Sequence, residues 1–145
     1  WRAVYNISEK YPSELAVKSN AHALARYASL VQESKMVPIV EPEVLMDGEH
    51  DIMKCYEVTS KVLKECYKEL KLHNINLKGT ILKPNMILPG NISIDISYAS
   101  EIAKIKFLLL SSIFDGVLEA SSSSHLELFF LSINSEILFS AVSSL

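Results

Sequence analysis

The sequence predicts an α/β fold in which helices connect parallel strands, and three observations support this. Short β-prone runs alternate with longer stretches of helical spacing. Strands begin near residues 1, 37 and 79, so the spacings are 36 and 42 residues. Hydrophobic residues make up 49% of the 145 residues, which excludes a wholly disordered chain. Helical crossovers make the strands parallel, so we expect a (β/α)8 barrel or an open doubly wound sheet.

The first strand and helix are expected within residues 1–34. Residues 3–7 form a short β-prone run that ends before a polar loop. Pro12, Ser13 and Glu14 are typical of a helix start, because proline fits the first turn and an acidic side chain stabilises it. Apolar positions then recur at helical spacing to about Ser34, namely Leu15, Leu24, Tyr27, Ala28 and Val31.

Two further strands and a second helix are expected over residues 37–82. Residues 37–40 form an apolar strand, with Pro38 at a position that a strand start tolerates. Turn residues at 46–48 precede a second helix, which is marked by a stripe of residues at helical spacing and is expected to end near His73 and Asn74. Gly79 introduces the strand 80–82, and Pro84 and Pro89 end it. The helical stripe consists of Ile52, Tyr56, Thr59, Leu63, Cys66, Tyr67 and Leu70.

Composition changes near Gly90, which predicts two parts, 1–90 and 91–145. All five prolines precede this point, whereas fourteen serines follow it. In the second part, residues 100–114 fit a helix and residues 119–124 a polar loop. Residues 126–131 fit either a strand or a helix, because a short apolar run does not distinguish them.

Several classes of protein are excluded by the sequence. A net charge of −3 argues against a nucleic-acid binder, and no apolar run is long enough to span a membrane. No signal peptide is visible, and without an initiator Met the chain is expected to start inside a longer protein. Cys55 and Cys66 would lie about 16 Å apart on one helix, so we expect reduced thiols and a cytoplasmic location.

Charged residues follow two of the predicted strands and form the candidate site. Glu41 and Glu43 follow the second strand, and Lys83 follows the third. The carboxyl ends of parallel strands share one edge, so these side chains should converge. A lysine that is partly buried near a second cation can be neutral and form a Schiff base, with Glu41 as acid/base. An ordinary ion pair between Glu41 and Lys83 is the alternative.

Several sequence motifs resemble those of class I fructose-bisphosphate aldolases. They are V-P-I-V-E-P-E at 37–43, D-G-E-H-D at 47–51 and G-T-I-L-K-P-N-M-I-L-P-G at 79–90. Trp1-Arg2 before a strand and N-A-H-A-L-A-R-Y-A-S at 20–29 agree as well. The resemblance covers residues 1–90 without a large gap.

The resemblance implies part of a (β/α)8 barrel that cleaves fructose 1,6-bisphosphate in glycolysis. Lys83 matches the Schiff-base lysine, Glu41 the general acid/base and Glu43 a neighbouring active-site carboxylate. Arg2 matches an arginine associated with a substrate phosphate. The resemblance implies a homotetramer, and neither a metal nor another cofactor.

The sequence also departs from the family. An active-site lysine directly before Trp1, the early strands, a glycine-rich phosphate loop and a C-terminal tyrosine region are missing. A barrel needs about 250 residues, and about three of eight units are predicted, so we expect this fragment by itself to be inactive. The alternative is a non-catalytic product, which is either a decayed, pseudogene-like copy or an aldolase-derived surface that only binds partners.

No metal site is expected from the sequence. His22, His50, His73 and His125 show no ligand spacing such as H-x-x-x-H. His22 and His73 are interpreted as solvated helix residues. The acidic residues around His50 are interpreted as loop and helix-start residues, because negative charge stabilises a helix N-terminus.

Overall fold

The computed structural model describes residues 1–95 and 97–118, with side chains to residue 113. The loop expected at 119–124 and the element expected at 126–131 lie outside the described residues. The chain divides into two compact units, Trp1–Ile96 and Ser97–Leu145.

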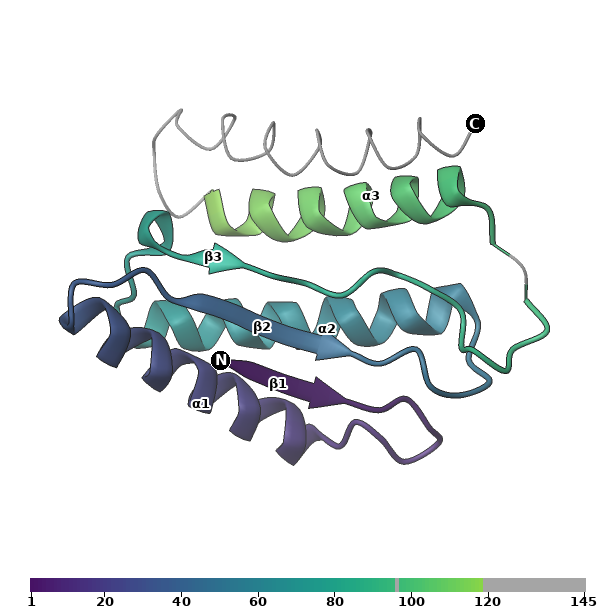
Figure 1. Ribbon diagram of the computed structural model, residues 1–145, viewed down its shortest axis with the longest axis horizontal. Coiled ribbons are helices and arrows are strands. Elements are labelled where there is room, and N and C mark those ends of the chain that lie inside the picture. The colour runs from purple at the N-terminus through teal and green to yellow at the C-terminus, as the bar shows by residue number, and fades with distance from the viewer. Residues whose placement is uncertain (96, 119–145) are drawn as a thin grey trace. The chain divides into compact units, whose positions relative to one another are not determined.

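The first unit has the predicted β-α-β-α-β order (Figure 1). Strand β1 is followed by helix α1, strand β2, helix α2, a short 3-10 helix η1 and strand β3. The three strands form one sheet in the order β1-β2-β3, and both neighbouring pairs are parallel. These elements are β1 (Arg2–Tyr5), α1 (Glu14–Glu33), β2 (Ile39–Val44), α2 (Ile52–Leu72), η1 (Leu77–Gly79) and β3 (Ile81–Leu82).

Side-chain caps begin both helices. The Ser13 hydroxyl accepts the N–H of Ala16 at 3.1 Å, and the Asp51 carboxylate accepts that of Lys54 at 2.6 Å. Each cap satisfies a backbone donor that the first turn leaves unpaired. The start expected around Ser13 is confirmed. Helix α2 ends at Leu72 with His73 as its C-cap, close to the predicted end near His73 and Asn74, and Asn74 has a positive φ of 55°.

The two faces of the sheet differ in burial, because successive side chains of a strand point to opposite sides. Helices α1 and α2 contact each other and the sheet, and they cover one face. On the opposite face Val4, Ile39 and Ile81 remain 43–44% exposed. The buried face presents Ala3, Tyr5, Val40, Pro42, Val44 and Leu82, which pack with α1 and α2 core residues such as Leu24, Leu63 and Leu70.

Strand β2 is longer than predicted. The sequence analysis ended it at Val40, whereas pairing with β1 continues to Val44. Residues 41 and 45 donate their N–H groups to β1, so alternation turns the nitrogen of Pro42 toward β3. Strand β3 ends at Leu82, before the position opposite Pro42. Proline has no N–H to donate, and no strand partner requires one at this position.

The two cysteines both lie in α2 and are buried. Neither takes part in a disulfide, in agreement with the expectation of reduced thiols.

The second unit begins with α3 (Ala99–Leu118), which confirms the helix expected over 100–114. Within the described ranges, no helix combines the length and apolar character that crossing a membrane requires.

Candidate active site

Four charged side chains gather on the sheet face that α1 and α2 leave uncovered. Arg2 belongs to β1, Glu41 and Glu43 belong to β2, and Lys83 directly follows β3. In the parallel pairing of β1 with β2, Arg2 lies opposite Glu41. Side chains two residues apart on a strand point to the same face, so Glu41 and Glu43 share one face of the sheet. The predicted convergence of Glu41, Glu43 and Lys83 is therefore found, and Arg2 joins them.

The contact between Lys83 and Glu41 is the centre of this group. The Lys83 ammonium donates a hydrogen bond to Glu41 Oε1 with Nζ and Oε1 2.6 Å apart. This hydrogen bond, helped by the charges of Lys83 and Arg2, holds the pKa of the Glu41 carboxyl below its usual value. Glu41 is thus an ionised acceptor of the hydrogen bond from Lys83.

Arg2 lies between the two carboxylates of β2. Its guanidinium forms an ion pair with Glu43, and its Nε lies 4.0 Å from Glu41 Oε1. The Arg2 side chain is 50% exposed, so part of its donor set faces solvent. Arg2 and Lys83 therefore both approach Glu41 Oε1.

Two details of the site differ from the sequence analysis. Glu41 and Glu43 lie within β2 and not beyond its end, because the strand continues through Pro42. The partial burial expected for Lys83 is also not found in the described part of the chain, since its side chain is 66% exposed. Ile81, two residues earlier on the same face, is exposed as well, whereas Asn85 is half-buried.

Asn85 positions the segment that carries Lys83, a role that the sequence analysis did not assign. Its side-chain oxygen accepts the N–H of Val44 at 3.2 Å, the donor left by the end of β3. Its amide donates to the buried Thr59 hydroxyl of α2 at 3.2 Å and to the Met86 carbonyl at 2.8 Å. The side chain therefore ties the segment after β3 to both β2 and α2.

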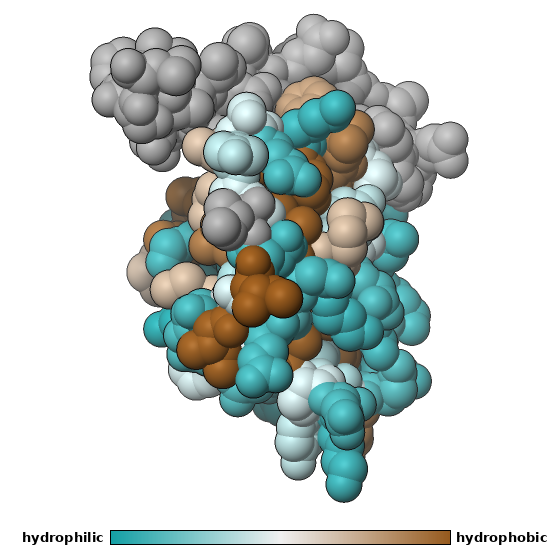
Figure 2. All heavy atoms as spheres, turned by 90° about the vertical axis from the view of Figure 1, so that its right-hand side faces the viewer, coloured by the Kyte–Doolittle hydropathy of each residue, from teal (hydrophilic) through white to brown (hydrophobic). Residues whose placement is uncertain are grey.

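The side toward which the strands point has a mixed surface. Figure 2 views the molecule from this side and shows apolar side chains among a larger number of hydrophilic ones. Met46 and Met86, in the loops after β2 and β3, are 55% and 42% exposed. A separate open groove is lined by α1 and α2 residues such as Glu14 and Lys61 and contains none of the four site residues. Because none of these four residues lines it, we assign no catalytic role to this groove.

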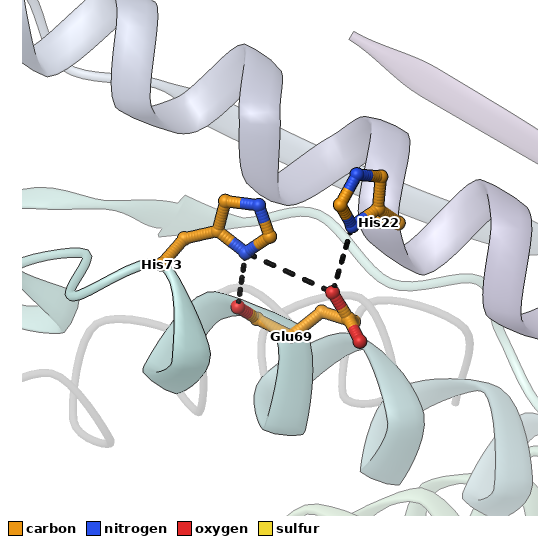
Figure 3. A group of neighbouring side chains, drawn as sticks. All are labelled: His22, Glu69 and His73. Atoms are coloured by element: carbon orange, nitrogen blue, oxygen red, sulfur yellow. Dashed lines mark hydrogen bonds and ion pairs between the residues drawn. The ribbon is translucent and has the colours of Figure 1, made fainter.

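A second polar group lies between α1 and α2. His22, Glu69 and His73 point toward one another (Figure 3), with ligand atoms within 4.8 Å of each other. The interpretation of the two histidines as separate solvated residues missed this contact. The i,i+4 spacing of Glu69 and His73 was the available signal, but His22 is 47 residues from Glu69 in the sequence.

The chain is similar to known proteins in both sequence and structure. Residues 1–118 match the model of the family described as fructose-bisphosphate aldolase class-I. Fructose-bisphosphate aldolase C-B of Danio rerio is 55% identical over 101 residues, covering 70% of this chain and 28% of the relative. Cytosolic fructose-bisphosphate aldolase 6 of Arabidopsis thaliana is 55% identical over 97 residues, covering 67% and 27%.

A solved structure shows the same fold. It is a Plasmodium falciparum fructose-bisphosphate aldolase, with a TM-score of 0.75 and 38% identity over 77% of this chain and 33% of that one. This likeness supports the expected partial α/β barrel. The chain spans about a quarter of the length of the curated relatives it matches.

Proposed function

Because the chain belongs to the class I fructose-bisphosphate aldolase family, we propose that it carries the Schiff-base part of such a lyase. The reaction would cleave fructose 1,6-bisphosphate into dihydroxyacetone phosphate and glyceraldehyde 3-phosphate. The observation that carries this proposal is the 2.6 Å hydrogen bond between Lys83 and Glu41 on the uncovered sheet face.

The proposed reaction begins with proton transfer from Lys83 to Glu41. The neutral amine attacks the C2 ketone of the sugar, which gives a carbinolamine. Glu41 returns its proton to the hydroxyl that leaves as water, and a protonated imine remains. The Glu41 carboxylate, which has given its proton to that water, takes the proton of the C4 hydroxyl, and the electrons of the C3–C4 bond move toward the imine. An enamine on Lys83 and a free aldehyde result.

We assign Arg2 and Glu43 to substrate binding and its control. Arg2 offers a planar set of donors that suits a phosphate, and half of its side chain is exposed. Its ion pair with Glu43 holds the guanidinium on the sheet face beside Glu41. A bound phosphate would therefore compete with Glu43 for Arg2. Glu43 would also be a second carboxylate near the reacting carbons.

We further propose a cytoplasmic location and a homo-oligomer as the working form. The names of two similar Arabidopsis relatives include the word cytosolic. Assembly is supported by the apolar residues that remain exposed on the uncovered sheet face. We keep the division near Gly90 as a proposal, with residues 1–90 carrying the whole candidate site.

Trapping the imine tests the function. The full chain is incubated with dihydroxyacetone phosphate and sodium borohydride, and the product is analysed by mass spectrometry. We expect reduction to fix the triose phosphate, less one oxygen, on the peptide that contains Lys83. Chelators should not reduce the yield, because the protonated imine and not a metal ion would accept the electrons.

Two lysine variants control the experiment. Lys83→Arg keeps the charge but cannot form the imine, so it should give no adduct. Lys54→Arg changes an exposed lysine that pairs with Glu57 on α2 and should react like the unmodified sequence. If no adduct forms on Lys83, the alternative is favoured, namely a non-catalytic product that is either a decayed copy or a surface that only binds partners. The observation that favours this alternative is the 66% exposure of the Lys83 side chain.

A further inference from the structure

The group of His22, Glu69 and His73 has the composition of a metal site. Glu69 lies in the last turns of α2, and His73 caps that helix one turn later, so both project from the same side. His22 extends from α1 toward them (Figure 3). The two rings meet edge to face, with their centroids 4.9 Å apart. Packing of α1 against α2 thus assembles three donors from distant parts of the sequence.

The distances within the group fit a small cation. Glu69 Oε2 lies 3.1 Å from His22 Nδ1 and 3.7 Å from His73 Nδ1. Ligand atoms around a tetrahedral ion with bonds of about 2.1 Å are separated by about 3.4 Å. The carboxylate oxygen already has this spacing to both rings. The cation would replace the proton that His22 and Glu69 share in their hydrogen bond.

We propose that His22, Glu69 and His73 form a binding site for a divalent transition-metal ion, with Zn²⁺ as the fitting ion. Two imidazoles and one carboxylate are a donor set that Zn²⁺ uses, with water at a remaining position. Imidazole ligands also favour Zn²⁺ over Mg²⁺ and Ca²⁺, which prefer oxygen. The His22 side chain is 53% exposed, so both the ion and a water ligand have access.

The surroundings of His73 support this assignment. Its Nδ1 lies 2.9 Å from the backbone carbonyl oxygen of Glu69. Metal-binding histidines commonly donate their second ring N–H to such a carbonyl, which fixes the orientation of the ring. In that arrangement His73 would bind the ion through Nε2, and the 3.7 Å from its Nδ1 to the Glu69 carboxylate would not be a distance between two ligand atoms. Alternatively, Nδ1 itself can bind beside the Glu69 carboxylate.

Competition with a chromogenic zinc chelator tests the proposal on the full chain. We expect one Zn²⁺ to bind per chain and Mg²⁺ not to compete. His22→Gln and His73→Gln should each weaken Zn²⁺ binding at least tenfold, because each removes a ligand. Glu65→Gln is the matched control, since it removes a carboxylate from the same helix that pairs with Lys68 instead. Its affinity should equal that of the unmodified chain.

Three results would overturn the metal site. These are unchanged affinity in both histidine variants, an equal loss in Glu65→Gln, and no binding of Zn²⁺ by the unmodified chain. Imidazole NMR of the unmodified chain does not depend on whether a variant folds. Zn²⁺ should shift the ring resonances of His22 and His73 together, and the absence of any shift would also contradict the proposal. Borohydride trapping on Lys83 should be the same with and without Zn²⁺, so the two proposals fail independently.

Discussion

Lys83 and Glu41 are 42 residues apart in the sequence, yet their side chains form a hydrogen bond. This contact could be predicted because adjacent parallel strands bring equivalent positions to the same edge. The exposure of Lys83 could not be predicted, since it depends on what covers that sheet face. The His22–Glu69–His73 group was missed for a related reason: it depends on the packing of two helices, which periodicity does not specify.

At the residue scale, His50 should make stability depend on pH. Burial of its imidazole lowers the pKa, so the folded chain favours the neutral ring. Below pH about 6.5 the unfolded chain takes up this proton first, and the free energy of unfolding falls. We expect urea denaturation at pH 5.5 to show lower stability than at pH 7.

His50→Gln provides the comparison, because glutamine does not titrate in this range. The variant should lose part of the stability difference between pH 7 and pH 5.5. The carboxyls of Glu14 and Glu41 have lowered pKa values, so their contribution is lost only at more acidic pH. An identical pH dependence in His50→Gln and the unmodified chain would show that this histidine is not the cause.

Asn85 gives a second prediction at this scale. Asn85→Leu removes an acceptor for the Val44 N–H and a donor to Thr59, so stability should fall by about 1–3 kcal/mol in urea denaturation. Asn85→Asp keeps the acceptor and loses the amide donors, so its loss should be smaller. Equal stability of Asn85→Leu and the unmodified chain would contradict this positioning role.

At the scale of elements, the helices and strands could largely be predicted from apolar spacing and from the capping residues Ser13 and Asp51. The predicted end of β2 was wrong, because Glu41, Pro42 and Glu43 have low strand propensity in isolation. Only the three-dimensional arrangement shows that the Pro42 nitrogen faces a position that β3 does not reach. Strand length at this site is therefore a tertiary property.

The loops after β2 and β3 approach each other closely at Gly90. A Cβ atom there would overlap the backbone carbonyl of Gly48, and the Gly90 N–H donates to the His50 carbonyl at 2.7 Å. Gly90→Ala should therefore lower the free energy of unfolding by about 1–3 kcal/mol. Gly79→Ala is the control, because the nearest atom there is a side-chain atom, Gln32 Nε2, at 3.3 Å and not a backbone atom. Equal effects of the two substitutions in thermal denaturation would contradict the close approach.

At the scale of the whole molecule, the buried thiols report whether the helices pack on the sheet. Cys55 and Cys66 are 2% and 0% exposed, and burial raises the pKa of the Cys66 thiol to about 12. Since the thiolate is the reactive form, a thiol reagent should react slowly in native buffer and rapidly in denaturant. The variant Cys66→Ser leaves Cys55 as the thiol that can react, so the labelling of the two cysteines can be told apart. Rapid labelling of both thiols in native buffer would show that this core does not form in the chain alone.

The family assignment rests on a stretch that corresponds to about a quarter of its curated relatives. Within that stretch the chain contains the amine, its acidic partner and the arginine on one sheet face. The first chemical step of the proposed reaction requires only the amine and the acid. That step can therefore be measured even where complete cleavage of the sugar bisphosphate is not observed.

The most direct measurement follows exchange of the carbonyl oxygen of dihydroxyacetone phosphate with water. Imine formation expels this oxygen, and hydrolysis of the imine restores it from the solvent, so a heavy-isotope label is lost at each cycle. We expect the chain to accelerate label loss, Glu41→Gln to slow the catalysed part about 100-fold and Lys83→Arg to abolish it. Label loss at the same rate with the unmodified chain and with Lys83→Arg would contradict Schiff-base chemistry at Lys83.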